Sequence, residues 1–210
     1  MLLMQAKICG VKDKVTLDYI INHKHPPTFV GFICNYPKSK RYLEFFDLQN
    51  LINIQKKNIK FVAVLVKPDE NFLKKIKDLN FEYYQLYDVD PEETKIIKNK
   101  YKKKIISAIT IKNIDDVKKY KNYEKISDII LFDSKGYEKS MSFDHSLIKD
   151  VPKKLKKMLA GDIKYNDDLE KYLKIADIID LSGSLETHNV KDLSKINIFL
   201  NNLQKLNDKN

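Results

Sequence analysis

Short apolar runs rich in β-branched and aromatic residues recur along the chain. Eight such runs occupy residues 5–9, 28–34, 61–66, 81–86, 104–111, 128–133, 157–160 and 177–181. Several of them, such as residues 61–66, are continuous in apolar side chains. Continuous runs, unlike alternating ones, are typical of parallel strands that are covered on both faces. The pattern therefore predicts a sheet of parallel strands.

Segments with apolar residues at helical spacing lie between several of these runs. The clearest cover residues 69–79, 91–98, 113–120 and 189–206. Asp69 and Asn113 are suited to cap a helix N-terminus, and Pro91 is suited to a first helical turn. The spacing from one strand start to the next is close to the minimum for a strand, a crossover helix and a return. We therefore expect strands and helices to alternate as eight strand–helix units.

This alternation predicts a single-domain (β/α)8 barrel over residues 1–210. Eight units in about 200 residues match the lower size limit of that fold. A doubly wound open sheet is the alternative, and the periodicity alone does not distinguish the two. No linker rich in Gly, Pro or Ser divides the chain, which favours one domain.

Composition excludes several classes of protein. No stretch approaches the roughly 18 consecutive apolar residues that a membrane-spanning helix needs. Residues 1–4 form too short an apolar run for the core of a signal peptide. The two cysteines, Cys9 and Cys34, cannot form a disulfide framework. We therefore expect a cytoplasmic protein with reduced thiols, and the sequence leaves open whether it is a monomer or a homodimer.

The chain carries a formal net charge of +10. Its densest basic cluster consists of Lys98, Lys100, Lys102, Lys103 and Lys104. The cluster precedes an apolar run, so we interpret it as a solvated helix end or connector and expect no nucleic acid partner and no membrane partner. Of the 39 basic residues, only Arg41 is an arginine. A guanidinium binds a carboxylate or phosphate through two parallel hydrogen bonds, which an ammonium cannot do, so Arg41 is a candidate anion-binding residue.

Chemistry-bearing residues and glycines gather at the ends of the expected strands. The chain has 5 glycines, whereas an average content of about 7% would give about 15. Gly10, Gly136, Gly161 and Gly183 follow expected strands, and Gly31 lies inside one. Catalytic groups of (β/α)8 barrels lie at the carboxyl ends of the strands. The candidates there are Cys9, Gln85, Asp133, Asp162 and Asp180, together with Cys34, which we interpret as a packing residue.

The last two strand ends predict a phosphate site. Barrel enzymes often bind phosphate with the loops that follow strands seven and eight. The backbone N–H groups and hydroxyls suited to bind the anion belong to Gly161, Asp162, Ser182, Gly183 and Ser184. The four histidines show no metal-ligand spacing, and no nucleotide phosphate loop is present. We therefore expect a phosphorylated small-molecule substrate, no metal and no cofactor.

The motifs at these strand ends resemble those of phosphoribosylanthranilate isomerases, in order along nearly the whole chain. Residues 7–10 read Lys-Ile-Cys-Gly, which resembles the opening signature of that family. Residues 38–42, 84–86, 131–134, 142–144, 159–161, 180–187 and 190–196 resemble further family motifs in register. The chain departs from the family at Lys40, which replaces a proline, and at Tyr87, where a histidine is common. The loop at residues 136–140 has one glycine where the family has Gly-Gly-Thr-Gly.

The resemblance implies an isomerase of tryptophan biosynthesis that performs an Amadori rearrangement. The reaction converts N-(5-phosphoribosyl)anthranilate to 1-(2-carboxyphenylamino)-1-deoxyribulose 5-phosphate. By resemblance, Asp133 is the general acid for the ring oxygen and Cys9 is the general base for the C2 proton. Arg41 would bind the anthranilate carboxylate, and Gln85 and Asp180 would also contact the substrate. We expect the barrel mouth to raise the pKa of Asp133 and to lower the pKa of Cys9, so that both groups work near pH 7.

Three other interpretations remain open. Another phosphosugar isomerase or epimerase of the same barrel group would share the phosphate loops. A basic RNA-binding barrel would concentrate basic and aromatic residues on one surface. A catalytically inactive paralogue is the third, and the presence of Cys9, Arg41 and Asp133 argues against it.

Overall fold

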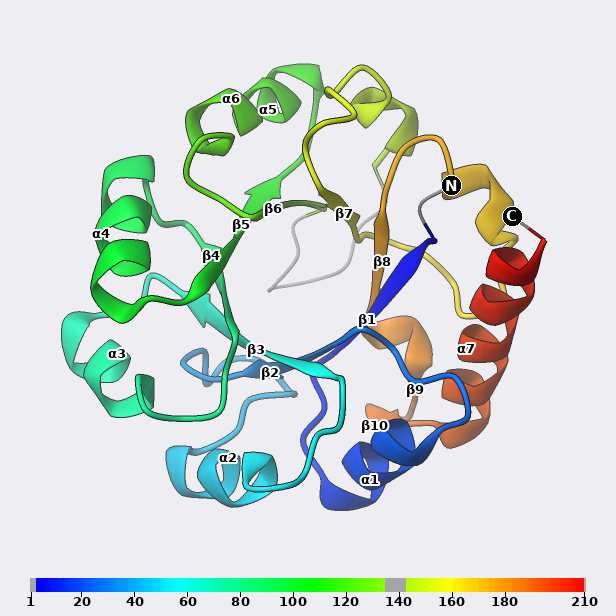
Figure 1. The fold of residues 1–210 in the computed structure, drawn as a ribbon, viewed down its shortest axis with the longest axis horizontal. Coiled ribbons are helices and arrows are strands. Elements are labelled where there is room, and N and C mark those ends of the chain that lie inside the picture. The colour runs from blue at the N-terminus through cyan, green and yellow to red at the C-terminus, as the bar shows by residue number, and fades with distance from the viewer. Residues whose placement is uncertain (1–2, 135–142, 210) are drawn as a thin grey trace.

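The computed structural model describes residues 3–134 and 143–209 of the chain. Its strands form one closed parallel barrel in the order β1 to β8, surrounded by helices (Figure 1). The strands are β1 (Gln5–Cys9), β2 (Phe29–Ile33), β3 (Lys60–Val66), β4 (Tyr83–Tyr87), β5 (Lys104–Thr110), β6 (Ile129–Asp133), β7 (Lys157–Leu159) and β8 (Ile178–Leu181). The eight expected parallel strands are confirmed, each close to its expected bounds.

The first and last strands pair directly, and this pairing excludes the open sheet. Residues 5–8 on β1 lie in parallel register with residues 178–181 on β8. A closed barrel leaves no edge strand with unpaired backbone groups. The fold is therefore the (β/α)8 barrel.

Alternate residues along the strands pack into two separate apolar layers, one inside the barrel and one between the barrel and the helices. On β3, Val62 and Val64 pack inside the barrel with Phe29 and Ile106. The neighbouring Phe61, Ala63 and Leu65 belong to the larger cluster between the barrel and the helices. Burial on both faces explains why the strand sequences are continuously apolar.

Most of the expected helices are present, with the expected caps. The α-helices are α1 (Lys14–Asn22), α2 (Phe45–Ile52), α3 (Glu70–Ile76), α4 (Pro91–Tyr101), α5 (Ile114–Lys118), α6 (Tyr120–Tyr123) and α7 (Leu193–Asp208). The side chains of Asp69 and Asn113 accept backbone N–H bonds at the starts of α3 and α5. Pro91 occupies the first turn of α4, where its missing N–H costs nothing. The helix expected over residues 113–120 is divided into α5 and α6.

Two of the eight expected strand–helix units have no α-helix among the described residues. The 3₁₀ helices η1 (His145–Ile148) and η2 (Leu169–Tyr172) follow β6 and β7 instead. Asp144 and Asp168 each bind a backbone N–H two residues ahead. Such local bonds offer the backbone an alternative to the helical ladder, which explains the 3₁₀ helices. The expected helix is absent after β7, whereas residues 135–142 after β6 lie outside the described residues.

A short hairpin delays the start of the last helix, which was expected at residue 189. Strands β9 (Glu186–Thr187) and β10 (Val190–Lys191) pair in antiparallel register. His188 and Asn189 connect them with φ angles of 51° and 62°, and a two-residue type I′ turn requires positive φ at both positions. Helix α7 therefore begins at Leu193, and the hairpin brings Glu186 and Lys191 to the barrel mouth.

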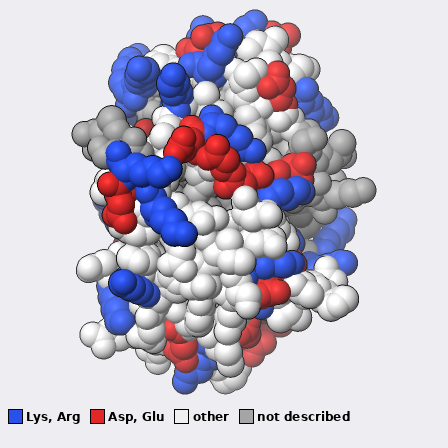
Figure 2. Space-filling model, turned by 90° about the vertical axis from the view of Figure 1, so that its right-hand side faces the viewer, with Lys and Arg blue, Asp and Glu red and all other residues white. Residues whose placement is uncertain are grey.

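The dense lysine cluster lies where it was expected, at the end of α4 and the start of β5. Lys98 pairs with Asp128 and Lys100 with Glu70, so acidic neighbours offset part of its charge. On the face shown in Figure 2, acidic side chains are interspersed among the basic ones. In the part of the chain that is described, no helix has both the length and the apolar character to cross a membrane.

Candidate active site

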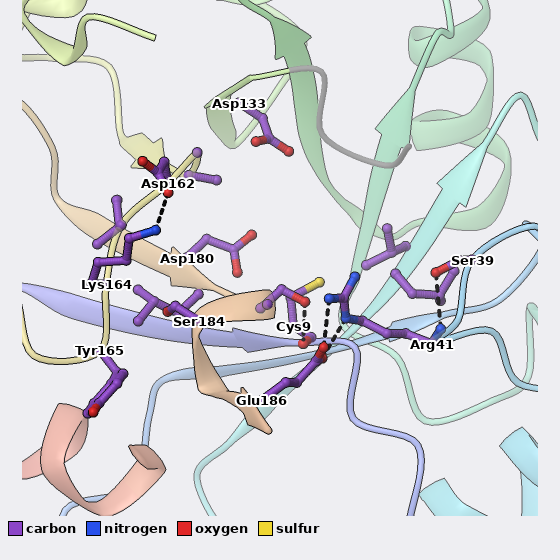
Figure 3. Close-up of a pocket in the computed structure, with 18 of the residues that line it drawn as sticks. Cys9, Ser39, Arg41, Asp133, Asp162, Lys164, Tyr165, Asp180, Ser184 and Glu186 are labelled. Carbon is purple, nitrogen blue, oxygen red and sulfur yellow. Dashed lines mark hydrogen bonds and ion pairs between the residues drawn. The ribbon is translucent and has the colours of Figure 1, made fainter. Parts of the chain in front are cut away.

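A pocket of about 450 Å³ opens at the carboxyl ends of the barrel strands. Cys9, Asp133 and Asp180 reach it from three different strands, β1, β6 and β8 (Figure 3). All the site residues expected from the sequence line this pocket except Gln85. The structure thus brings together side chains that are far apart along the chain.

Asp133 ends β6 and is buried, with 7% of its surface exposed. The Tyr87 hydroxyl donates to Asp133 Oδ2 at 2.8 Å. Burial raises the pKa of the Asp133 carboxyl to about 7, the bond from Tyr87 opposes that rise, and the charge of Asp180 adds to it. The expected direction is confirmed. A carboxyl with such a pKa keeps its proton in about half of the molecules at neutral pH, as a general acid needs.

Cys9 ends β1, and its thiol is also buried. Burial raises the pKa of Cys9, the Lys7 ammonium opposes that rise, and the Asp180 carboxylate adds to it. The expected lowering of the Cys9 pKa is therefore wrong. The sequence did not reveal the cost of burying a thiolate, which here exceeds the attraction of the nearest cation.

Arg41 follows β2 and is bound to Glu186 at the pocket wall (Figure 3). Its Nε and one Nη donate to the two carboxylate oxygens of Glu186 at 2.5 and 2.8 Å. Lys191 Nζ lies 2.7 Å from the same carboxylate. A Cβ atom at Gly10 would lie 2.3 Å from Arg41 Cδ, so the glycine leaves room for the arginine. The two parallel hydrogen bonds that made Arg41 a candidate anion-binding residue are therefore already formed once, with a carboxylate of the protein itself.

The residues expected at the phosphate line the pocket where the loops after β7 and β8 begin. Gly161 and Asp162 have positive φ angles, so the backbone turns sharply after β7. Ser182 Oγ donates to the Cys9 carbonyl at 3.0 Å and ties its loop to β1. Ser184 Oγ is buried with no hydrogen-bond partner among the described residues. A buried, unpaired hydroxyl beside a pocket is suited to bind a ligand.

Two of the candidate residues, Gln85 and Cys34, do not line the pocket. Gln85 is fully buried on β4, and its Nε2 donates to the Tyr87 hydroxyl at 3.2 Å. Its position two residues before the strand end puts it one layer deeper in the barrel, so it touches the pocket only through Tyr87. Cys34 is buried and its thiol donates to the Phe32 carbonyl, which confirms its interpretation as a packing residue. The loop at residues 136–140 lies outside the described residues.

Several charged or polar residues near the site were not expected there, and four of them bind one another or an expected site residue: Lys7, Tyr87, Glu186 and Lys191. Lys7 pairs with Asp180 below the pocket, Tyr87 binds Asp133, and Lys191 joins Glu186 beside Arg41. Lys7, Glu186 and Lys191 lie inside motifs already noted, at residues 7–10, 180–187 and 190–196. Tyr87 stands where the resembling family commonly has a histidine, and this departure was its only signal.

Comparison with known proteins finds matches to one enzyme family across nearly the whole chain. A family model described as N-(5'phosphoribosyl)anthranilate (PRA) isomerase matches residues 6–202. The N-(5'-phosphoribosyl)anthranilate isomerase of Agrobacterium fabrum is 32% identical over 204 residues, covering 92% of this chain and 91% of that protein. The protein of the same name from Thermoanaerobacter pseudethanolicus is 30% identical over 205 residues, covering 94% of this chain and 97% of that protein.

Solved structures of such isomerases share the fold. Phosphoribosyl anthranilate isomerase from Thermotoga maritima matches with a TM-score of 0.85 at 24% identity, covering 97% of this chain and all of that one. A further phosphoribosyl anthranilate isomerase, in complex with reduced 1-(o-carboxyphenylamino)-1-deoxyribulose 5-phosphate, matches with a TM-score of 0.83 at 23% identity, covering 97% of this chain and 100% of that chain. The family match, the curated relatives and the barrel agree: this chain belongs to the N-(5'-phosphoribosyl)anthranilate isomerase family.

Proposed function

We propose that this protein isomerises N-(5-phosphoribosyl)anthranilate to 1-(2-carboxyphenylamino)-1-deoxyribulose 5-phosphate, with Asp133 as general acid and Cys9 as general base. The observation that carries the proposal is the pairing of two groups in one pocket. A carboxyl with a pKa of about 7 and a thiol both reach it from strand ends. The reaction needs one proton donor and one proton acceptor on the same sugar.

The first proton goes from Asp133 to the ring oxygen of the ribose. As that oxygen accepts the proton, the C1–O bond breaks and the nitrogen lone pair forms a C1=N double bond. Asp133 is left as a carboxylate, which the Tyr87 hydroxyl stabilises through its hydrogen bond of 2.8 Å. The pKa of Asp133 near 7 allows it both to donate this proton and to recover one afterwards.

The second proton goes from C2 of the opened sugar to the thiolate of Cys9. The positive charge on the C1=N group makes the C2 proton more acidic, so the base need not be strong. The electron pair of the broken C–H bond forms a C1=C2 double bond and neutralises the nitrogen. The resulting enolamine gains a proton at C1 and loses its C2 hydroxyl proton, which gives the 2-ketone product.

Binding groups at the pocket wall fit the two anionic ends of this substrate. The backbone and hydroxyl groups of Gly161, Asp162, Ser182, Gly183 and Ser184 are proposed to hold the phosphate. The unpaired Ser184 Oγ supports this proposal. Asp180 Oδ1, also buried without a partner among the described residues, is suited to accept a bond from a sugar hydroxyl or the anthranilate nitrogen.

Arg41→Lys should lower kcat/KM at least tenfold, a loss of about 1.4 kcal/mol in transition-state binding. Arg41 is proposed to bind the anthranilate carboxylate with the N–H groups that Glu186 does not use. A lysine keeps the charge but cannot bind two carboxylates through a planar fork. Steady-state kinetics of the folded variant check the result, and wild-type kinetics would remove Arg41 from the binding site.

Tyr87→Phe should move the break near pH 7 in the pH–rate profile, where the rate stops rising, to higher pH by up to about one unit. Without the tyrosine hydroxyl, the Asp133 carboxylate loses the bond that lowers its pKa, so the acid keeps its proton to higher pH. Tyr83→Phe is the matched control, because Tyr83 is another buried β4 tyrosine that does not line the pocket. An unshifted break in Tyr87→Phe, or an equal shift in the control, contradicts this role.

The direct test is a fluorescence assay in which phosphoribosylanthranilate is generated in place. The wild-type protein should consume it, and the fluorescence of the substrate should fall with time. No turnover by a folded sample would reject the proposal in favour of another phosphosugar isomerase of the same barrel group.

A further inference from the structure

A lysine ammonium is completely buried directly beneath the pocket. Lys7 lies on β1, its side chain is 0% exposed, and its Nζ is 2.8 Å from Asp180 Oδ2. The two residues are register partners across the β1–β8 pairing that closes the barrel. Lys7 does not line the pocket. A buried ion pair is costly to desolvate and contributes little to stability, so its position beside a reactive group calls for a functional explanation.

On β2, which pairs with β1 on the side opposite to β8, a glycine leaves room for the ammonium to lie close to the thiol. Gly31 on β2 is the register partner of Cys9. A Cβ atom at Gly31 would lie 3.1 Å from Lys7 Nζ and 3.1 Å from Cys9 Sγ. Because both atoms lie that close to one point, they are no more than about 6 Å apart, within the range where an opposite charge shifts a pKa. In a chain poor in glycine, Gly31 leaves the space that both side chains occupy.

Several charged or titratable groups face the Cys9 thiol from the strands and loops packed around it. They are Lys7 on β1, Tyr87 on β4, Asp180 on β8, Arg41 after β2 and Lys191 on β10. Arg41 and Lys191 share the one carboxylate of Glu186, which offsets one of their two charges, and Lys7 lowers the pKa of Cys9 more than Lys191 does. Burial lowers the pKa of Lys7, but the charges of Asp180 and Cys9 together raise it by more than burial lowers it. The pKa of Lys7 therefore lies above its usual value, and Lys7 stays an ammonium.

We propose that Lys7 is a positioning residue that stabilises the Cys9 thiolate, with Asp180 orienting its ammonium and Gly31 providing the room. Lys7 transfers no proton itself, since its role is to raise the fraction of Cys9 that is ionised. The consequence for the C2 proton transfer rests on the proposed function, in which the thiolate is the base. The electrostatic effect on the thiol does not depend on that function.

The test measures the thiol without substrate. The rate of alkylation by iodoacetamide is followed against pH in a Cys34→Ala background, so that Cys9 is the only thiol. Lys7→Met should raise the apparent pKa of Cys9 by at least one unit and slow alkylation at pH 8 about tenfold. In the isomerase assay, kcat should fall at least tenfold, whereas KM changes less than about threefold because Lys7 does not line the pocket.

Lys157→Met is the matched control, because Lys157 is a buried lysine at the start of β7, at the other end of the barrel. An unchanged or lower Cys9 pKa in Lys7→Met, or an equal shift in Lys157→Met, overturns the proposal. If Lys7→Met does not fold, Gly31→Ala keeps every charge but displaces both side chains, and it too should raise the Cys9 pKa. A shift in the thiol pKa without isomerase activity in the wild type would reject only the proposed function.

Discussion

Replacing Cys9 with alanine is expected to lower kcat at least hundredfold, which corresponds to about 2.7 kcal/mol or more of lost transition-state stabilisation. General bases typically contribute between a hundredfold and ten thousandfold to a rate. The alanine keeps the backbone of β1, the Ser182 bond to the Cys9 carbonyl and the wall of the pocket. Substrate binding should therefore change little, and the loss should be confined to kcat in the fluorescence assay.

The second cysteine provides a control for this experiment. Cys34 is also buried at a strand end, but its thiol donates to the Phe32 carbonyl outside the pocket. Cys34→Ala removes the same atom from the core and should leave kcat within about threefold of wild type. If Cys9→Ala retained most of its activity, or if the two variants lost activity equally, Cys9 could not be the base.

The strands could be predicted from the sequence because each one is buried on both faces. Closure could not be predicted from periodicity, since it depends on the contact between β1 and β8, which is not encoded locally. The expectation of an α-helix after β7 was wrong for a related reason. Asp144 and Asp168 carry capping side chains, which favour a helix start and an isolated turn alike, and only the surrounding packing decides between them.

The pocket was largely predictable and its interactions were not. Cys9, Asp133 and Asp180 could be chosen because they lie at or next to the carboxyl ends of strands, and these ends must meet. Interacting residues of the pocket come from remote parts of the chain. Lys7 and Asp180 are 173 positions apart, and Arg41 and Glu186 are 145 positions apart. The direction of the Cys9 pKa depends on these partners and on burial, so the sequence could not supply it.

Replacing Asp133 with asparagine is expected to have two opposite effects, and the first is on activity. Asparagine has the shape of the aspartic acid but no proton to give, so kcat should fall at least hundredfold. In the wild type, kcat should stop rising with pH near 7, because from there on the growing thiolate fraction of Cys9 is offset by the loss of the Asp133 proton. The residual activity of Asp133→Asn should lack this break and keep rising with pH toward the higher pKa of Cys9, which is checked by measuring both profiles.

The second effect of Asp133→Asn is on stability, and it has the opposite sign. The pKa of Asp133 is about 7 in the folded chain and about 3.9 when unfolded, so the folded state holds its proton more tightly. Between pH 4 and 7 the Asp133 carboxyl ionises in the unfolded chain but not in the folded one, and the free energy of unfolding falls by up to about 4 kcal/mol.

Asparagine at this position has no proton to lose, so the free energy of unfolding of Asp133→Asn lacks this fall. The variant should therefore match the wild type near pH 4 and be more stable by several degrees in Tm at pH 8, as thermal unfolding at both pH values will test. An equal Tm difference at both pH values would mean that the Asp133 carboxyl is not held in its acid form by burial, and the assignment of Asp133 as the acid would lose its physical basis.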